Sequence, residues 1–292
     1  MATQFQQIAV VSGKGGTGKT TLLASWATLA REAVLADCDV DAANLHLLLR
    51  PELQEAQDFY GANVAVRDPA LCNRCGECER RCRFAAISTT EVDALACEGC
   101  GLCVLVCPRD ALRLEPALTG RYFLSQTPYG PFSHARLYPG AESSGRLVTV
   151  VRKQAEDLAL ARGTRLILLD GPPGVGCTAV ASITEVNLVI AVTEPTLSGI
   201  HDMERVVALA RGFRLPVAAV INKADINLRN AARIEKFCRA GGIPVLARLP
   251  FDPIVTKYIS ACTPLVEYDD GPVSQGLRRA WQGALKLLAA GG

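Results

Sequence analysis

The sequence predicts an α/β protein with a doubly wound, mostly parallel sheet and a small α+β domain inserted into it. Short apolar, β-branched runs alternate with stretches of helical periodicity. The runs are apolar throughout, as in strands that helices cover on both faces. Between about residues 58 and 118 this alternation stops and cysteines accumulate, which predicts the insertion.

The expected elements follow in a regular order. A strand at 8–11 and a strand at 33–36 flank a helix at 20–31. Beyond the insertion, we expect strands at 165–169, 187–192, 217–221 and 244–247, and helices at 147–161, 198–212, 228–240 and 277–290. Residues 127–145 are rich in Gly, Pro and Ser, which predicts a long loop that is functional or mobile. The sheet domain is therefore expected to comprise 1–57 and 119–292, and the inserted domain 58–118.

The composition restricts the class of protein. The chain has 292 residues, 49% of them hydrophobic, and a formal net charge of +2. This length forms one large domain or two smaller ones, and the apolar content exceeds that of disordered chains. The nearly neutral charge predicts no nucleic-acid partner. No apolar run reaches the roughly 20 residues that cross a bilayer, and no secretory signal is evident, so we expect a cytoplasmic protein.

Eight of the twelve cysteines form two runs with the same spacing, C-x2-C-x2-C-x3-C. Bacterial two-cluster ferredoxins have this spacing, and the fourth cysteine of each run ligates the other cluster. Paired zinc sites are the alternative, but zinc ribbons use two separated C-x2-C pairs. We therefore predict two [4Fe-4S] clusters, one held by Cys72, Cys75, Cys78 and Cys107, the other by Cys97, Cys100, Cys103 and Cys82.

A glycine-rich segment follows the first expected strand and opens the first helix. Its sequence, GKGGTGKT, satisfies the pattern GxxxxGK[ST]. In such a loop the backbone N–H groups cradle phosphates, the lysine reaches the β and γ oxygens, and the hydroxyl holds Mg²⁺. The predicted nucleotide site comprises Gly13, Lys14, Gly15, Gly16, Thr17, Gly18, Lys19, Thr20 and Thr21, with Thr20 as a metal ligand.

The additional lysine makes this loop more specific. The form KGGxGKT resembles the deviant Walker A loop of the MinD, ParA, Mrp and nitrogenase iron protein superfamily, and the resemblance covers the chain outside the insertion. It implies that Lys14 crosses the interface of a homodimer, or of a heterodimer with a paralogue, and contacts the partner's nucleotide. There its charge would stabilise the transition state as an arginine finger does.

The same resemblance assigns roles to four residues at the ends of expected strands. It implies that Asp39 orients or activates the attacking water, that Asp37 lies nearer the metal, and that Asp170 holds Mg²⁺ through water. It implies an adenine contact for Asn222. The segment Asn222–Asp225 also fits the guanine-reading NKxD pattern, but Lys14 favours ATP.

Four cysteines lie outside the two runs. We expect Cys38, Cys177, Cys238 and Cys262 to be buried structural thiols. Cys177 has the same offset from Asp170 as a cluster ligand of the nitrogenase iron protein, but that enzyme needs a second cysteine, and none lies between Cys107 and Cys177. The helix at 277–290 is expected to pack on the sheet, although a helix lying on a membrane surface is the alternative.

The whole combination resembles MinD-superfamily ATPases that carry an inserted two-cluster ferredoxin domain. The expected cofactors are two [4Fe-4S] clusters, ATP and Mg²⁺. Three functions are open: an ATP-gated electron-transfer protein with a redox client, a scaffold or carrier that delivers metalloclusters to a client, and a spatial organiser with a redox sensor. The first is the preferred prediction.

Overall fold

The structure, a computed structural model, describes residues 5–141 and 145–291. The chain divides into two compact units. The sheet unit comprises Met1–Ala56, Tyr122–Arg136 and Ser143–Gly292, and the cysteine unit comprises Gln57–Arg121 and Leu137–Glu142. The eight clustered cysteines all lie in the cysteine unit.

Nine strands form one sheet in the order β3-β4-β5-β2-β6-β1-β7-β8-β9. The neighbours from β2 to β9 pair in parallel, and β5 is parallel to β2. The predicted doubly wound, mostly parallel sheet is therefore confirmed. The strands are β1 Gln6–Ser12, β2 Val34–Asp37, β3 Glu52–Arg67, β4 Leu112–Thr127, β5 Gly130–Leu137, β6 Leu166–Pro173, β7 Leu188–Thr193, β8 Val217–Ile221 and β9 Val245–Arg248.

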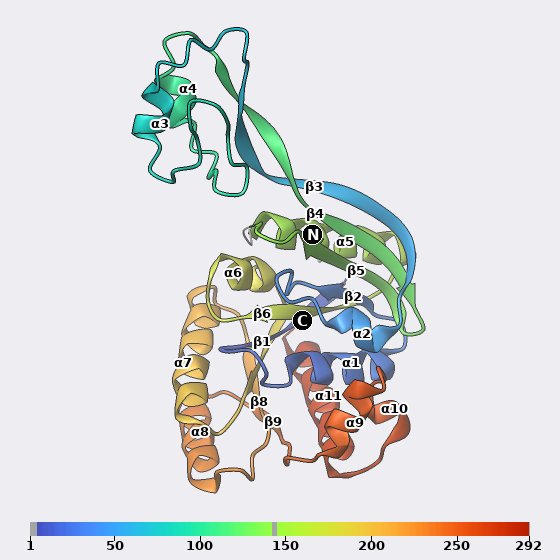
Figure 1. The fold of residues 1–292 in the computed structure, drawn as a ribbon. Helices are drawn as coiled ribbons and strands as arrows, with labels where there is room; N and C mark the ends of the chain where they lie inside the picture. The colour runs from blue at the N-terminus through green and yellow to red at the C-terminus, as the bar shows by residue number, and fades with distance from the viewer. Residues whose placement is uncertain (1–4, 142–144, 292) are drawn as a thin grey trace. The chain divides into compact units, whose positions relative to one another are not determined.

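Helices cover both faces of this sheet (Figure 1). Ile8 and Val10 of β1 pack into a core with helices α1 and α11, while Ala219 and Ile221 of β8 pack on the opposite face with α7 and α8. Burial of both faces explains why the strands are apolar at every position. The helices of this unit are α1 Lys19–Ala30, α2 Leu45–Leu49, α5 Gly145–Arg162, α6 Cys177–Ile183, α7 Leu197–Gly212, α8 Leu228–Ala240, α9 Ile254–Ser260, α10 Leu265–Tyr268 and α11 Pro272–Ala290.

The C-terminal helix packs on α1 through two tryptophans. The rings of Trp26 and Trp281 lie 5.4 Å apart, and Trp26 Nε1 donates a hydrogen bond to the Leu277 carbonyl at 3.1 Å. Leu277, Ala284 and Leu288 are also buried. The apolar face of α11 is thus covered within the chain, as predicted. Within 5–141 and 145–291, no helix is long and apolar enough to cross a membrane.

The prediction of a loop over 127–145 is wrong for its central part. Gly130–Leu137 forms β5, which is joined to β4 by two residues and pairs with β2. A connection this short is typical of an antiparallel pair. Gly130 permits the pairing, because its φ is 141° and a Cβ there would lie 2.2 Å from the Ala33 carbonyl oxygen. The glycine that indicated a loop thus marks a close approach of two strands.

The cysteine unit contains two short helices, α3 Glu77–Arg81 and α4 Leu102–Leu105, which lie side by side (Figure 1). Each begins after a glycine in the left-handed region, Gly76 with φ 77° and Gly101 with φ 76°. Strands β3 and β4 supply the remaining regular structure of the unit. The two cysteine runs therefore have the same local fold.

Candidate nucleotide and cluster sites

The glycine-rich loop connects the end of β1 to the start of α1. Gly18 precedes the helix with φ 95°, a conformation that a residue without a Cβ adopts at low cost. Gly13 lies so close to α7 that a Cβ there would be 2.1 Å from the Asp202 Cβ. The loop leaves the first N–H groups of α1 free of helical partners, and these groups, with the helix dipole, form a site for an anion.

The structure brings the predicted metal-binding and catalytic residues together beside this loop. Thr20 Oγ1 donates a 2.6 Å hydrogen bond to Asp170 Oδ2, and Lys19 Nζ lies 3.9 Å from Asp39 Oδ2. Asp37, the last residue of β2, is the register partner of Asp170 within β6. Four of these five residues are buried, with Thr20 partly so.

The carboxylate of Asp37 also organises the chain around it. One of its oxygens accepts a hydrogen bond from the Asp39 N–H at 3.1 Å, and the other accepts one from the Leu45 N–H at 3.2 Å. These bonds fix the segment that carries Asp39 after β2. That Asp37 lies nearer the metal stays a prediction.

Burial of several carboxylates at one place changes their ionisation. Desolvation raises the pKa of Asp170 to about 6. Desolvation, with the negative charges of Asp170 and Asp39, raises the pKa of Asp37 well above its usual range. Burial also raises the pKa of Asp39, against the opposing effect of Lys19. Such a cluster favours a neutralising cation.

The donor set fits Mg²⁺. Asp170 Oδ1 is buried and has no hydrogen-bond partner within the described residues, so one carboxylate oxygen is available beside the Thr20 hydroxyl. Magnesium binds one or two carboxylates together with substrate phosphates. Thr20 and Asp170 would hold the ion, which would neutralise charge on the phosphates.

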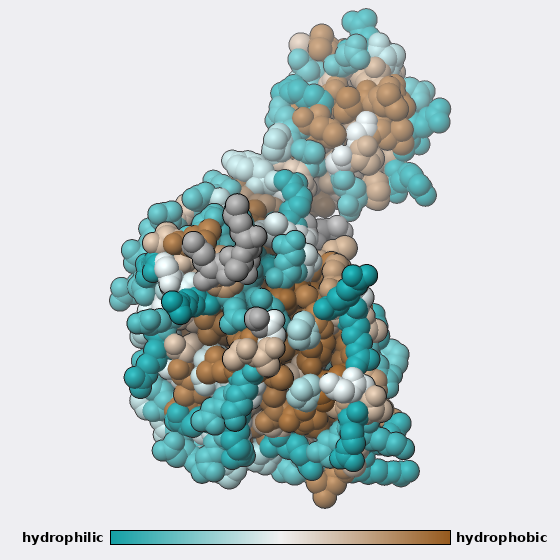
Figure 2. Space-filling model, turned by 180° about the vertical axis from the view of Figure 1, so that it is seen from behind, coloured by the Kyte–Doolittle hydropathy of each residue, from teal (hydrophilic) through white to brown (hydrophobic). Residues whose placement is uncertain are grey.

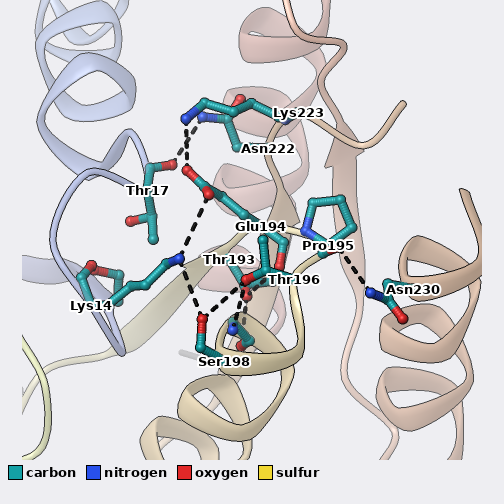
Figure 3. Close-up of polar contacts among 12 residues, drawn as sticks. Lys14, Thr17, Thr193, Glu194, Pro195, Thr196, Ser198, Asn222, Lys223 and Asn230 are labelled. Atoms are coloured by element: carbon teal, nitrogen blue, oxygen red, sulfur yellow. Dashed lines mark hydrogen bonds and ion pairs between the residues drawn. The ribbon is translucent and has the colours of Figure 1, made fainter. Parts of the chain in front are cut away.

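Lys14 makes its contacts within its own chain (Figure 3). Its Nζ lies 3.4 Å from Ser198 Oγ and 3.9 Å from Glu194 Oε2. Lys223 Nζ contacts the other oxygen of Glu194 at 2.8 Å. Sequence reasoning assigned no role to Glu194, Ser198 or Lys223. The signals were the position of Glu194 directly after the apolar strand β7 and that of Lys223 within the segment Asn222–Asp225.

Asn222 and Asp225 lie at the end of β8 and contact neighbouring backbone. Asn222 Nδ2 donates to the Thr17 carbonyl at 2.9 Å, and its Oδ1 accepts from the Lys223 N–H at 3.0 Å. Asp225 Oδ1 accepts a 2.7 Å hydrogen bond from the Phe251 N–H. Asp225 therefore holds the segment that follows β9, a structural role that does not need guanine.

An open cavity extends from the glycine-rich loop to the C-terminal helices. Its polar side contains Lys19, Thr20, Asp39 and Asn222, and its apolar side contains residues of α9 and α11 and of the segment 249–252. Predicted phosphate-, metal- and base-binding residues thus line one space within the sheet unit. A ligand with a charged and an apolar end would fit this arrangement.

In the cysteine unit, each of two cavities is lined by four cysteines. Within the part of the chain that the structure describes, no three His, Cys, Asp or Glu side chains converge closely enough to hold a single metal ion. We call these the Cys72 cavity and the Cys97 cavity. The first is lined by Cys72, Cys75, Cys78 and Cys107, the second by Cys97, Cys100, Cys103 and Cys82.

Backbone groups also point toward the thiols of both cavities. The Ala111 N–H donates to Cys107 Sγ at 3.3 Å, and the Ala65 N–H donates to Cys97 Sγ at 3.5 Å. Four thiolates with N–H donors to sulfur are the donor set of an iron–sulfur cluster. The residues present therefore fit such a group in each cavity.

The four scattered cysteines divide into two pairs. Cys38 and Cys238 are buried, as predicted, but Cys177 and Cys262 are exposed, so the prediction is wrong for these two. Cys177 is the first residue of the short helix α6, and Cys262 follows α9 with φ 52°. Both lie at helix ends, where no further turn covers the side chain.

The chain is similar to proteins of a known family over most of its length. A family model described as "CobQ/CobB/MinD/ParA nucleotide binding domain" matches residues 8–265. An uncharacterised protein of Methanocaldococcus jannaschii is 30% identical over 261 residues, 88% of either chain. The solved structure of the septum site-determining protein MinD with Mg-ADP, from Pyrococcus horikoshii, matches with a TM-score of 0.60 and 19% identity, and 99% of each chain is covered.

A shorter similarity concerns another kind of protein. A polyferredoxin protein of Methanothermobacter thermautotrophicus is 47% identical over 47 residues, which are 15% of this chain and 11% of that relative.

Proposed function

Since the chain belongs to the CobQ/CobB/MinD/ParA family of nucleotide-binding proteins, we propose that it binds Mg·ATP and hydrolyses it. The contact between Thr20 and Asp170 carries this proposal. A P-loop hydroxyl and a carboxylate on a neighbouring strand hold Mg²⁺ in P-loop NTPases, and here these two groups lie 2.6 Å apart.

The other residues have complementary roles in this reaction. The N–H groups of the loop and the Lys19 ammonium bind the β- and γ-phosphates. Asp39, 3.9 Å from Lys19, orients the attacking water. Hydrolysis breaks the bond from the γ-phosphorus to the bridging oxygen, and water supplies the hydroxyl of the released phosphate. Lys14 acts across the interface of a dimer, where its charge stabilises the transition state.

We further propose that the cysteine unit binds two [4Fe-4S] clusters and transfers electrons through them. The grouping of the cysteines supports this proposal, since each cavity combines three cysteines of one run with the fourth of the other. The similarity to a polyferredoxin protein points the same way. Nucleotide-dependent association of two chains would then control delivery of electrons to a partner protein.

Metal analysis tests the cluster proposal. The full chain, purified without oxygen, is expected to contain about eight irons from two four-iron clusters. Cys75→Ser and Cys100→Ser each remove one ligand of one cavity and are expected to lower the iron content to about half. Cys177→Ser is the matched control and retains the full content, because Cys177 lies in the sheet unit. Stoichiometric zinc without iron contradicts the proposal.

Three further readouts distinguish this function from its alternatives. Reversible reduction of both clusters with retention of iron supports electron transfer. Transfer of iron and sulfide to an apo-protein supports the carrier function instead. ATP-dependent binding to vesicles of anionic lipid supports a spatial organiser, but the apolar face of α11 is buried in the chain, so we expect no such binding.

A further inference from the structure

The two cysteine cavities are built from matched positions. Cys97 follows Cys72 by 25 residues, and the same offset relates the remaining cysteines of the two runs. Every residue that lines the Cys72 cavity has a counterpart, 25 residues later or earlier in the chain, that lines the Cys97 cavity. Differences between counterparts therefore show directly how the two environments differ.

Five matched pairs are polar only in the Cys72 cavity, and one pair, Pro108 and Arg83, differs in the other direction. Two of the five are Arg74 with Gly99 and Glu77 with Leu102. In the other three, Arg67, Arg109 and Thr89 line the Cys72 cavity. Their counterparts in the Cys97 cavity are all apolar: Val92 for Arg67, Phe84 for Arg109 and Leu114 for Thr89. The Cys72 cavity is thus the more polar of the two.

Among the described residues that line the cavities, only Arg67 changes the balance of charge. Without it, each cavity is lined by two arginines and one glutamate, most of them exposed, so that solvent and salt screen their charges similarly. These residues are Arg74, Arg109 and Glu77 for the Cys72 cavity, and Arg81, Arg83 and Glu98 for the Cys97 cavity.

The side chain of Arg67 is directed at the cysteines. It stands at the end of β3, and its Nη2 donates to the Ser88 carbonyl and lies 3.8 Å from Cys78 Sγ. Its Nε and Nη1 are buried without a hydrogen-bond partner among the described residues. Among the described residues, each cavity has a backbone N–H that donates to sulfur, so the half-buried Arg67 adds a cation and a donor to the Cys72 cavity.

We infer that Arg67 makes the two clusters unequal, so that the cluster in the Cys72 cavity has the more positive reduction potential. This inference rests on the proposed function, that the cysteines hold two clusters. Reduction adds negative charge, and a cation beside a ligating sulfur stabilises the reduced form, since net charge and hydrogen bonds to sulfur set cluster potentials. The electron of a singly reduced chain then resides on the Cys72 side, and the Cys97 side is the stronger reductant.

A potentiometric titration of the anaerobic full chain, followed by electron paramagnetic resonance, tests this inference. Dithionite is oxidised and each cluster takes up one electron. We expect two separate steps in the wild-type protein. Arg67→Gln is expected to move only the more positive step, to a more negative potential, and to change the electron's distribution between the clusters at least tenfold, about 59 mV for a one-electron couple. The control Arg109→Gln, an exposed cation on the same cavity, leaves both steps in place.

Iron is measured in every variant, so that two failures are distinguishable. A wild-type chain without iron contradicts the proposed function. With full iron content, Arg67→Gln overturns the inference if it shifts neither step or shifts the more negative one. If Arg67→Gln loses iron, Arg67→Lys decides the question. It keeps the charge, so the separation of the steps is expected to persist, and its collapse overturns the inference.

Discussion

Lys14 and Glu194 form an ion pair within one chain, with 3.9 Å between Nζ and Oε2. The Lys14 side chain is 35% exposed and that of Glu194 is 10% exposed, so solvent screens the attraction on the lysine side of this long contact. Lys14 can therefore leave Glu194 at little cost when a phosphate of another chain's nucleotide is near. Glu194 keeps a second partner in Lys223, 2.8 Å away, so its buried carboxylate is still paired with a cation when Lys14 leaves.

Substitutions of the two loop lysines are expected to have different effects. Lys19→Ala removes the cation that meets the phosphates within its own loop, so we expect loss of nucleotide binding. Lys14→Ala should still bind nucleotide, but it should not associate when ATP is added. Its hydrolysis rate should fall by about 10³–10⁵-fold, as it does when an arginine finger is lost. Calorimetry and a phosphate-release assay measure both effects, with Lys153→Ala on the exposed face of α5 as control.

Mixing two inactive variants tests whether Lys14 acts in trans. A Lys14→Ala chain and an Asp39→Ala chain are expected to form mixed dimers with one complete site, which combines Asp39 of one chain with Lys14 of the other. Activity should then return in the mixture. If mixed dimers form and stay inactive, Lys14 acts within its own chain.

Asp170 is expected to lower stability when no metal is bound. Its folded pKa of about 6 exceeds the ordinary value of 3.8. Between these pH values the folded chain retains a proton that the unfolded chain has released, so the contribution of Asp170 to stability falls as pH rises and is lowest above pH 6. Asp170→Asn, which keeps an oxygen for Thr20, should therefore stabilise the metal-free protein at pH 7 and have little effect near pH 4.

Denaturation in urea with EDTA, at pH values from 4 to 7.5, measures this difference. Asp157→Asn, an exposed carboxylate on α5, should show no comparable trend. At pH 7 with Mg²⁺, the wild type is expected to hydrolyse ATP and Asp170→Asn is not, because the variant lacks the charge that holds the ion. A difference between wild type and Asp170→Asn that is constant with pH would contradict the assignment of the raised pKa.

ATP is expected to displace GTP in competition for the nucleotide site. Asp225 accepts a hydrogen bond from the Phe251 N–H and thus has a partner without guanine. Asp225→Ala should loosen the segment after β9 and weaken the binding of ATP and of GTP by a similar factor. A selective loss of GTP binding in this variant would show that Asp225 reads the base.

Much of the fold could be predicted from sequence, because each signal was local. Strands covered on both faces are apolar at every position, and the glycine-rich loop lies between such a strand and a helix, where its motif requires it. The strand β5 was missed, since Gly130 and its neighbours resemble loop residues unless the approach to Ala33 is known.

The site was predictable to the extent that its residues belong to motifs. Most of the predicted loop residues line one cavity together with Asp39 and Asn222, and Asp170 contacts Thr20 of that cavity. Of the predicted loop residues, Gly13, Lys14 and Thr17 do not line it. No role was predicted for Glu194, Ser198 and Lys223, because their contacts depend on how β7 and β8 approach the loop. The role of Arg67 was equally hidden, as it depends on a comparison of two cavities in space.

The affinity for ATP in two redox states tests the central claim, that nucleotide and clusters are coupled. Coupling between two sites is reciprocal and typically amounts to 5–150-fold in affinity. A non-hydrolysable ATP analogue is therefore expected to bind oxidised and dithionite-reduced protein with dissociation constants that differ by at least fivefold. Equal dissociation constants for the two states, in protein with a full complement of iron, would contradict the account.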